Sequence, residues 1–221
     1  MLEITNVKVY DLKESVIASG NAMRLEPVEY TDEEFQKGLI RMKKLVNASK
    51  NGQVKCHHNA LCGIRVSFDI IYPQYWTPEF QRYNFVDIVT SSSKMHRLLK
   101  MNLDKSCNKY VKEETINSLK EDIDKYNTIL EGYEETYPLV FQLRNEKIKT
   151  TNKNEALYYQ WMIILSNCPL GLELFMRVST NYLQLQTIYY QRKNHKLKED
   201  WGNFINFIEG LPYFKELILG E

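Results

Sequence analysis

One segment of the chain combines hydroxyl groups and cations in the way that an anion-binding site requires. The segment is FQRYNFVDIVTSSSKMHRL, residues 80–98. Arg82, Lys94 and Arg97 supply positive charge, and three consecutive serines at 91–93 supply hydroxyl donors. A phosphate monoester is a dianion that binds well to such cations and donors. The residue types suit a phosphate site, although a run of serines is more often part of a helix surface.

The same segment is predicted to be helical, because its apolar residues recur three and four positions apart. Pro73 and Pro78 break the chain just before it, and we expect two helical pieces within 80–98. On a helix over 86–98, Ser92 and His96 would share one face, and Lys94 and Arg97 would share a neighbouring face. Arg82 would enter this site from the preceding turn.

The elements around this segment indicate an α+β protein with a small N-terminal β-sheet and long helices. Residues 3–10 and 61–71 alternate apolar and polar side chains, which is typical of half-buried strands. A capping pair, Thr31 with Glu34, begins a helix that continues to position 46. Further helices are predicted at 18–24, 113–137, 156–167 and 170–190, and polar loops at 148–155 and 191–200. A final helix that carries Trp201, Phe204, Phe207 and Ile208 is predicted before Pro212. Two strands followed by helices favour one domain over residues 1–221.

Composition limits the classes of function. The chain has 221 residues, 43% of them hydrophobic, with 29 basic and 28 acidic side chains. With this balance, the net charge of the chain does not attract nucleic acid or an anionic membrane, so an anion must bind at a local site. No apolar run approaches the length of a signal peptide core or a membrane span, and we expect a cytoplasmic protein.

The segment CHHNALC is a candidate metal site, because Cys56, His57, His58 and Cys62 lie close in sequence. Structural zinc usually takes two ligand pairs from separate turns, whereas adjacent histidines point apart here. No metal is therefore predicted. The four cysteines include no C-x-x-C pair, and reduced thiols are expected.

Two blocks of this sequence are similar to the flavin-dependent thymidylate synthases. RYN at Arg82–Asn84 stands where that family has an arginine-histidine-arginine triplet, and SSK at Ser92–Lys94 falls at the Ser-x-Arg end of its signature. The second block, PLGLELFMRVSTNYLQLQTIYYQR at Pro169–Arg192, resembles the family's Pro-Leu-x-Leu segment. The chain departs from the family pattern at Glu79, Tyr83, Asn84, Thr90, Leu165 and Leu183.

The resemblance implies a function and a set of site residues. Arg192 corresponds to the arginine that polarises the uracil carbonyl, and it is the implied catalytic residue. Arg82, Ser92 and Lys94 would receive the phosphate and ribose of the nucleotide. The flavin would be contacted by His57, Arg82, Tyr83, Asn84 and Asn181. The implied reaction methylates dUMP to dTMP with FAD, using methylenetetrahydrofolate and NADPH, and the implied assembly is a homotetramer.

Two alternatives remain open from the sequence. The changes in the triplet fit a relative that keeps a nucleotide pocket but modifies another pyrimidine or lacks the flavin reaction. A third possibility belongs to another class, because the lysine-rich segments NEKIKTTNKN and QRKNHKLK could contact a nucleic acid or a partner protein. The balanced net charge makes nucleic acid the weaker of these interpretations.

Overall fold

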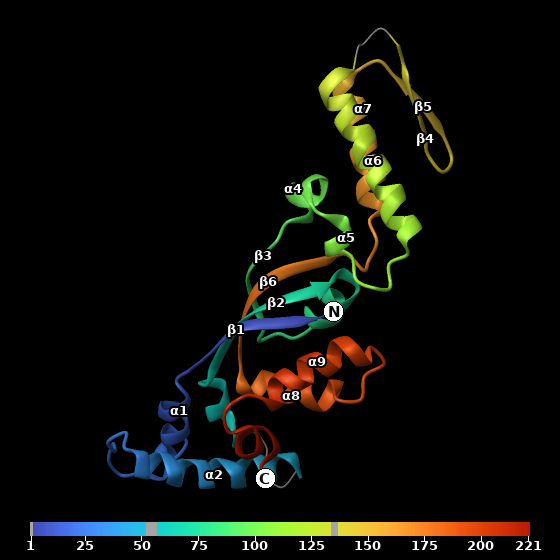
Figure 1. Cartoon of the computed structure of the whole chain (residues 1–221). Helices are drawn as coiled ribbons and strands as arrows, with labels where there is room; N and C mark the ends of the chain where they lie inside the picture. Colours follow the sequence, from blue (N-terminus) through green and yellow to red (C-terminus); the bar gives the residue numbers. More distant parts are fainter. Residues whose placement is uncertain (1, 52–56, 134–136) are drawn as a thin grey trace. The chain divides into compact units, whose positions relative to one another are not determined.

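The computed structural model describes residues 2–51, 57–133 and 137–221 (Figure 1). Contacts divide the chain into two compact units. Unit 1 contains Met1–Tyr72, Trp76–Ser91 and Phe175–Glu221, and unit 2 contains Pro73–Tyr75 and Ser92–Leu174. Helices and antiparallel strands are mixed throughout, so the predicted α+β class is confirmed.

Unit 1 is built on a four-stranded sheet in the order β1-β2-β6-β3. The strands are β1 (Glu3–Tyr10), β2 (Arg65–Pro73), β3 (Asp87–Ser91) and β6 (Glu173–Asn181). β1 pairs antiparallel with β2, with Ile4 opposite Ile70, and β3 pairs antiparallel with β6, with Ile88 opposite Val178. The alternation that predicted β2 is visible in its burial, because Val66, Phe68 and Ile70 are buried whereas the residues between them are half-buried.

Aromatic side chains pack on the buried face of this sheet, and Figure 1 shows helix α9 (Lys198–Glu209) beside it. Helix α9 places Phe204 5.9 Å and Phe207 4.8 Å from Phe68, measured between ring centroids. Trp76 stacks on Phe80 at 4.4 Å. Such ring pairs add specific geometry to the burial of large apolar area, which fixes α9 against the sheet.

The remaining helices of unit 1 pack beside this core. They are α1 (Leu12–Ala18), η1 (Asn21–Met23), α2 (Asp32–Lys50), η2 (Asn59–Cys62), α3 (Thr77–Phe80), α8 (Tyr182–Arg192) and a π-helical turn η5 (Lys215–Leu219). α2 begins as predicted, because Thr31 Oγ1 accepts a hydrogen bond of 3.2 Å from the Glu34 amide. Its buried stripe packs against α1 and η5.

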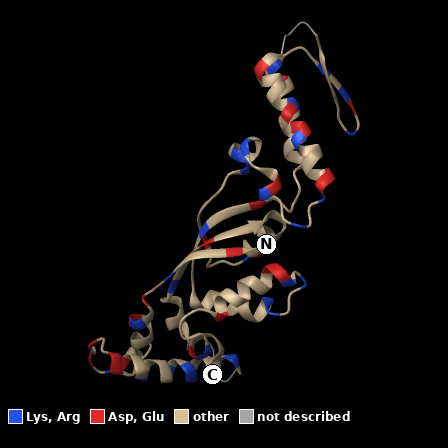
Figure 2. Cartoon of the chain, viewed as in Figure 1, with Lys and Arg blue, Asp and Glu red and all other residues tan. Residues whose placement is uncertain are grey.

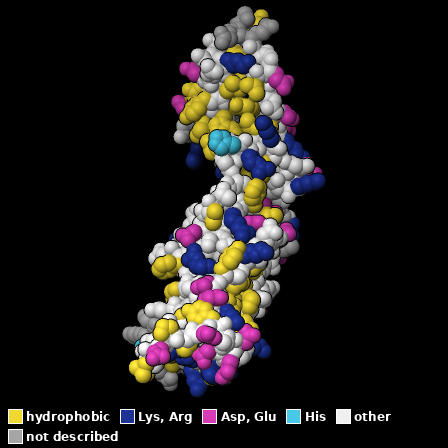
Figure 3. All heavy atoms as spheres, turned by 90° about the vertical axis from the view of Figure 1, so that its left-hand side faces the viewer, with side chains coloured by type: hydrophobic (Ala, Val, Ile, Leu, Met, Phe, Trp, Pro, Cys, Tyr) yellow, Lys and Arg dark blue, Asp and Glu magenta, His cyan; other side chains and the backbone are white. Residues whose placement is uncertain are grey.

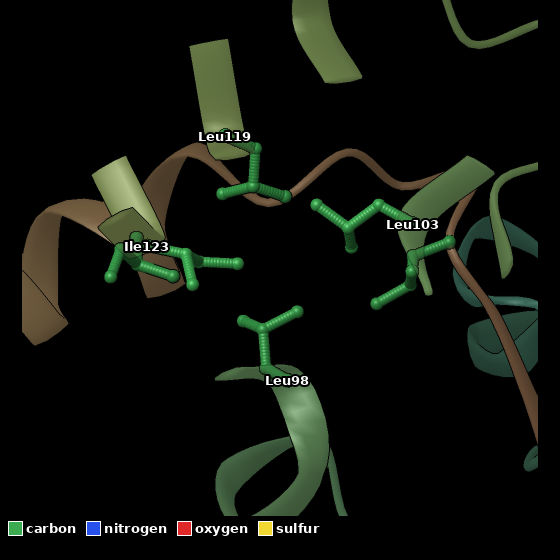
Figure 4. Close-up of a cluster of buried hydrophobic side chains, with 6 residues drawn as sticks. Leu98, Leu103, Leu119 and Ile123 are labelled. Carbon is green, nitrogen blue, oxygen red and sulfur yellow. The ribbon is translucent and has the colours of Figure 1, made fainter. Parts of the chain in front are cut away.

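Unit 2 is a helical pair with a short hairpin. It contains η3 (Gln74–Trp76, shared at its end with unit 1), α4 (Lys94–Arg97), η4 (Leu98–Lys100), α5 (Leu103–Ser106), α6 (Glu113–Gly132), β4 (Leu139–Gln142), β5 (Lys147–Thr150) and α7 (Lys153–Asn167). Figure 4 shows Leu98, Leu103, Leu119 and Ile123 pointing toward one another from η4, α5 and α6. The long helix over 113–132 and the helix over 153–167 confirm two of the predictions.

Several predicted helices are wrong. Residues 87–91 form the edge strand β3, so Ser92 does not share a helix with His96. Residues 173–181 form β6, and only 182–192 of the predicted second helix is helical. The helix expected at 18–24 is also wrong, because α1 ends at Ala18 and only the 3₁₀ turn η1 follows at Asn21–Met23. Residues 148–150 of the expected loop form part of β5. In β3 and β6 the pairing of strands outweighs an apolar spacing that is also compatible with a helix.

None of the helices in the described part of the chain combines the length and the apolar character that a membrane span needs.

Candidate functional site

Arg192 lies at the end of α8 and is held by two side chains from the segment after β2. Its Nη1 forms an ion pair with Glu79 Oε2 at 3.2 Å, and its Nε donates a hydrogen bond of 2.7 Å to Tyr83 Oη. Glu79 comes from α3, and Tyr83 from the turn that follows it. The Arg192 side chain is only 16% exposed, so its charge depends on these partners.

Helix α9 completes this cluster through Trp201. The Trp201 ring centroid lies 4.7 Å from Cζ of Arg192, which is close enough for a cation–π interaction. The indole N–H of Trp201 donates a hydrogen bond of 2.8 Å to Glu79 Oε2. Glu79 Oε2 therefore accepts hydrogen bonds from both the Arg192 guanidinium and the Trp201 indole.

His195 provides a further donor to the same carboxylate. Its Nε2 lies 3.4 Å from Glu79 Oε2, and its Nδ1 accepts a hydrogen bond of 3.2 Å from the Leu197 amide. Because Nδ1 acts as an acceptor, the proton of the neutral imidazole belongs on Nε2, toward Glu79. We call Glu79, Tyr83, Arg192, His195 and Trp201 the Arg192 cluster.

Tyr83 positions Arg192 from the other side. Its hydroxyl accepts the hydrogen bond from Arg192 and donates one of 3.1 Å to Gln191 Oε1. Tyr83 is 8% exposed, so this arrangement is fixed by packing. Tyr83 therefore fixes the position of the Arg192 guanidinium group.

The neighbours of Tyr83 in sequence have a different environment. Arg82 and Asn84 are exposed. Phe85 is 64% exposed, and its backbone is held by Gln184 Oε1, which accepts from the Phe85 amide at 3.3 Å. The exposed Arg82 is thus available to an anion in solution.

Asn181 has a clear role in the fold. It is 4% exposed, and its Oδ1 accepts a hydrogen bond of 2.9 Å from the Gln184 amide. This bond caps the first turn of α8. Asn181 therefore sets where β6 ends and where the helix that carries Arg192 begins.

His57, Ser92 and Lys94 are not members of the Arg192 cluster. His57 is exposed in the turn before η2. Ser92 and Lys94 belong to unit 2. There, Lys94 Nζ donates a hydrogen bond of 3.0 Å to Gln74 Oε1, and Gln74 Nε2 donates one of 3.4 Å to the Pro169 carbonyl. The structure thus joins Tyr83 with Arg192, and describes Lys94 in a separate polar contact.

Two of the cysteines, Cys107 and Cys168, are not arranged as nucleophiles. Burial raises the pKa of the Cys107 thiol to about 11, and burial also raises the pKa of Cys168. Both thiols are therefore protonated near neutral pH, and a thiol is a poor nucleophile compared with its thiolate. Cys56 of the CHHNALC segment lies outside the described residues. Among the described residues, no cluster of His, Cys, Asp or Glu could hold a metal ion.

Sequence reasoning missed three members of the Arg192 cluster. In the sequence, Glu79 is only a departure from the family pattern, Trp201 lies in a predicted helix and His195 lies in a predicted loop. No local spacing could have joined them, because residues 79 and 201 meet only when α9 packs against the segment after β2. A buried arginine does imply an acidic partner, but the sequence does not say which one.

This chain has the fold of the flavin-dependent thymidylate synthases. The flavin-dependent thymidylate synthase ThyX from Helicobacter pylori, complexed with FAD and dUMP, matches 97% of this chain and 98% of its own, with a TM-score of 0.60 and 15% identity. A second structure of that enzyme with FAD and dUMP covers 99% of this chain and 97% of its own, with a TM-score of 0.61 and 13% identity.

A structure of another enzyme shares the fold. The UMP/dUMP methylase PolB from Streptomyces cacaoi, bound with 5-Br dUMP, covers 99% of this chain and 94% of its own, with a TM-score of 0.54 and 9% identity. No protein-family model and no curated protein sequence matches the chain. The predicted resemblance is therefore confirmed at the level of the fold.

Proposed function

We propose that this protein binds dUMP, or a closely related pyrimidine nucleoside monophosphate, and modifies the C5 carbon of its ring. One observation carries the proposal. The fold matches structures of two different enzymes over nearly the whole chain, and each of these structures contains dUMP or its 5-bromo derivative. A fold alone does not define a function, so the proposal also needs a site in this chain that suits the ligand.

The Arg192 cluster suits the edge of a uracil ring. Uracil presents a carbonyl oxygen, an N–H group and a second carbonyl oxygen along one edge. Arg192 is a guanidinium donor, and Glu79 Oε1, the carboxylate oxygen that does not pair with Arg192, is an acceptor. Donation from Arg192 to a uracil carbonyl would polarise the ring, and Glu79 would accept from the ring N–H. Cytosine has an acceptor at that ring nitrogen, so a carboxylate there disfavours it.

We propose Arg82 of unit 1 as a phosphate ligand, and Ser92 and Lys94 of unit 2 are the further ligands that the family resemblance implies. A dianion needs cations and donors, and Arg82 is an exposed guanidinium. The Lys94 ammonium group donates to the neutral amide oxygen of Gln74, and it could donate to a charged phosphate oxygen instead. Charged partners form the stronger hydrogen bonds, which favours this exchange.

The residues present fit a flavin in part. His57, Arg82 and Asn84 are exposed and can contact FAD. The Tyr83 hydroxyl, in contrast, is bonded to Arg192 and Gln191, and Asn181 Oδ1 caps the first turn of α8. When bound, FAD would supply the redox chemistry of carbon transfer from methylenetetrahydrofolate, with NADPH as reductant. The chain's own residues would orient the pyrimidine and polarise it. We also propose a homotetramer, as the family resemblance implies.

A second candidate is a nucleotide-binding relative that lacks the flavin reaction. The observation that favours it is the engagement of Tyr83, which stands at a flavin-contacting place and yet has its hydroxyl bonded to Arg192 and Gln191. Such a protein would still bind dUMP through the same cluster.

Complementation of a thymidine-requiring strain separates the two candidates. Growth without thymidine, together with yellow protein that releases flavin on denaturation, supports flavin-dependent methylation. Colourless, soluble protein that fails to complement but is thermally stabilised by dUMP supports the second candidate. Failure of both complementation and dUMP binding would contradict the proposed function.

A further inference from the structure

Unit 2 contains a groove that the proposed nucleotide site does not use. It has a volume of about 710 Å³ and lies between α6, α7 and the strand β4. Its apolar wall is formed by Ile129, Leu139, Val140, Phe141 and Ile163. Ile129 and Phe141 belong to the core of this unit, so the groove opens directly onto well-packed side chains.

The groove runs along the edge of β4 rather than beneath one of its faces. All four residues of β4, Leu139–Gln142, line it. Successive side chains of a strand point to opposite faces, so a cavity that touches four in a row must border the edge. In the described part of the chain, the other edge of β4 pairs with β5.

The register of the hairpin shows which backbone groups face the groove. The Leu143 amide bonds to the Glu146 carbonyl, so 143 and 146 form a hydrogen-bonded pair of the antiparallel ladder. Such pairs alternate with non-hydrogen-bonded ones, and Val140 opposite Lys149 is therefore a non-hydrogen-bonded pair. The N–H and C=O groups of Val140 point away from β5, toward the groove.

The rim of the groove is acidic. Glu121, Asp122 and Asp124 line it from α6, against one cation, Lys125. Lys125 forms its ion pair with Asp122 at 3.3 Å. Glu121 and Asp124 are exposed, so their carboxylates can contact an occupant of the groove. Figure 2 shows both acidic and basic residues along α6.

We propose that this groove binds an extended peptide segment of a partner protein in which basic and apolar residues alternate. The segment would add as a third strand beside β4, with its backbone bonded to that of Val140. Its apolar side chains would enter the wall near Ile129 and Phe141, and its basic side chains would face Glu121 and Asp124. Figure 3 shows apolar side chains gathered over the α6 and α7 region. In the described part of this unit, the groove joins apolar side chains to a strand edge and to acidic side chains.

A short synthetic peptide tests this proposal on the full chain. The probe is Ac-Lys-Ile-Lys-Ile-Lys-NH2 with a rhodamine label, which is long enough to span β4, and its matched control replaces every Lys by Glu. Fluorescence anisotropy should show saturable binding of the Lys probe, weakened by salt, and binding of the Glu probe that is at least about ten-fold weaker.

Two kinds of variant identify the surface. Val140→Pro removes the outward N–H and should abolish binding, whereas Lys149→Pro, its partner across the hairpin, should not, because the Lys149 N–H points away from both β4 and the groove. The double substitution Glu121→Lys with Asp124→Lys, at exposed positions that tolerate change, should reverse the preference between the two probes. Glu131→Lys, at an exposed position of α6 outside the groove, should leave it unchanged.

Three results would overturn the proposal. Equal binding of both probes would show that charge does not select the occupant, and unchanged binding to Val140→Pro would show that the strand edge is not used. Absence of binding at millimolar peptide would also reject it. Sedimentation of the same samples shows whether a second copy covers the groove: self-association that Glu121→Lys with Asp124→Lys abolishes would assign the groove to the chain itself and reject the partner peptide.

Discussion

Replacing Glu79 by Ala should destabilise the protein strongly, because this carboxylate holds several donors at once. Arg192 Nη1 at 3.2 Å, Trp201 Nε1 at 2.8 Å and His195 Nε2 at 3.4 Å all meet Glu79 Oε2. Removing one member of a buried pair costs about 3–5 kcal/mol, because the other charge is left buried and unpaired. Arg192 is 16% and Glu79 32% exposed, so solvent reduces this cost.

We therefore expect Glu79→Ala to lower the free energy of unfolding by about 3 kcal/mol. For a chain of this length that corresponds to a fall in Tm of about 6–12 °C. Glu79→Gln keeps an oxygen acceptor but loses the charge, and it should cost about half as much. Thermal unfolding followed by circular dichroism measures both.

The control is an ion pair that is shorter but exposed. Lys120 Nζ lies 2.7 Å from Asp104 Oδ1, and these side chains are 41% and 64% exposed. Asp104→Ala should cost less than about 1 kcal/mol, because exposed ion pairs contribute little. A Tm for Glu79→Ala within 2 °C of the Asp104→Ala value would refute the reasoning that burial, rather than distance, decides the contribution.

Two further predictions concern thiol reactivity and helix packing. Iodoacetamide at pH 8 should label the exposed Cys62 faster than Cys107, and the labelling rate of Cys107 should rise about ten-fold per pH unit up to its pKa of about 11. Peptide mass spectrometry measures both rates, and equal rates for Cys62 and Cys107 at pH 8 would contradict this prediction. Gly38→Ala should lower the free energy of unfolding by about 1–3 kcal/mol, because its Cβ would lie 2.8 Å from the Val16 carbonyl oxygen, whereas Gly202→Ala, with no atom within 4 Å, should raise it by about 0.5–1 kcal/mol. Chemical denaturation of the two variants should give shifts of opposite sign, and shifts of the same sign would contradict the packing of α1 against α2.

Some elements were predictable because local signals and tertiary packing agree. Thr31 and Glu34 begin α2, and the alternation around Phe68 predicts β2 with its buried face. The long stripe over 113–132 is one helix because its apolar spacing fits no strand. The mixed class followed from these elements.

Other elements were not predictable from local signals. β6 alternates Met176 and Val178 inward, but its apolar run continues into α8, and only pairing with its neighbours in the sheet selects the strand. β3 is an exposed edge strand with no buried face to mark it. The Arg192 cluster likewise depends on contacts between residues more than a hundred positions apart.

The central claim is that the Arg192 cluster recognises the uracil edge of a nucleoside monophosphate. Isothermal titration of the full chain with dUMP and with dCMP tests it most directly. We predict saturable binding of dUMP, at least about ten-fold weaker binding of dCMP, and a loss of this preference in Glu79→Gln. Equal affinity for the two nucleotides, or no binding of either, would contradict the claim.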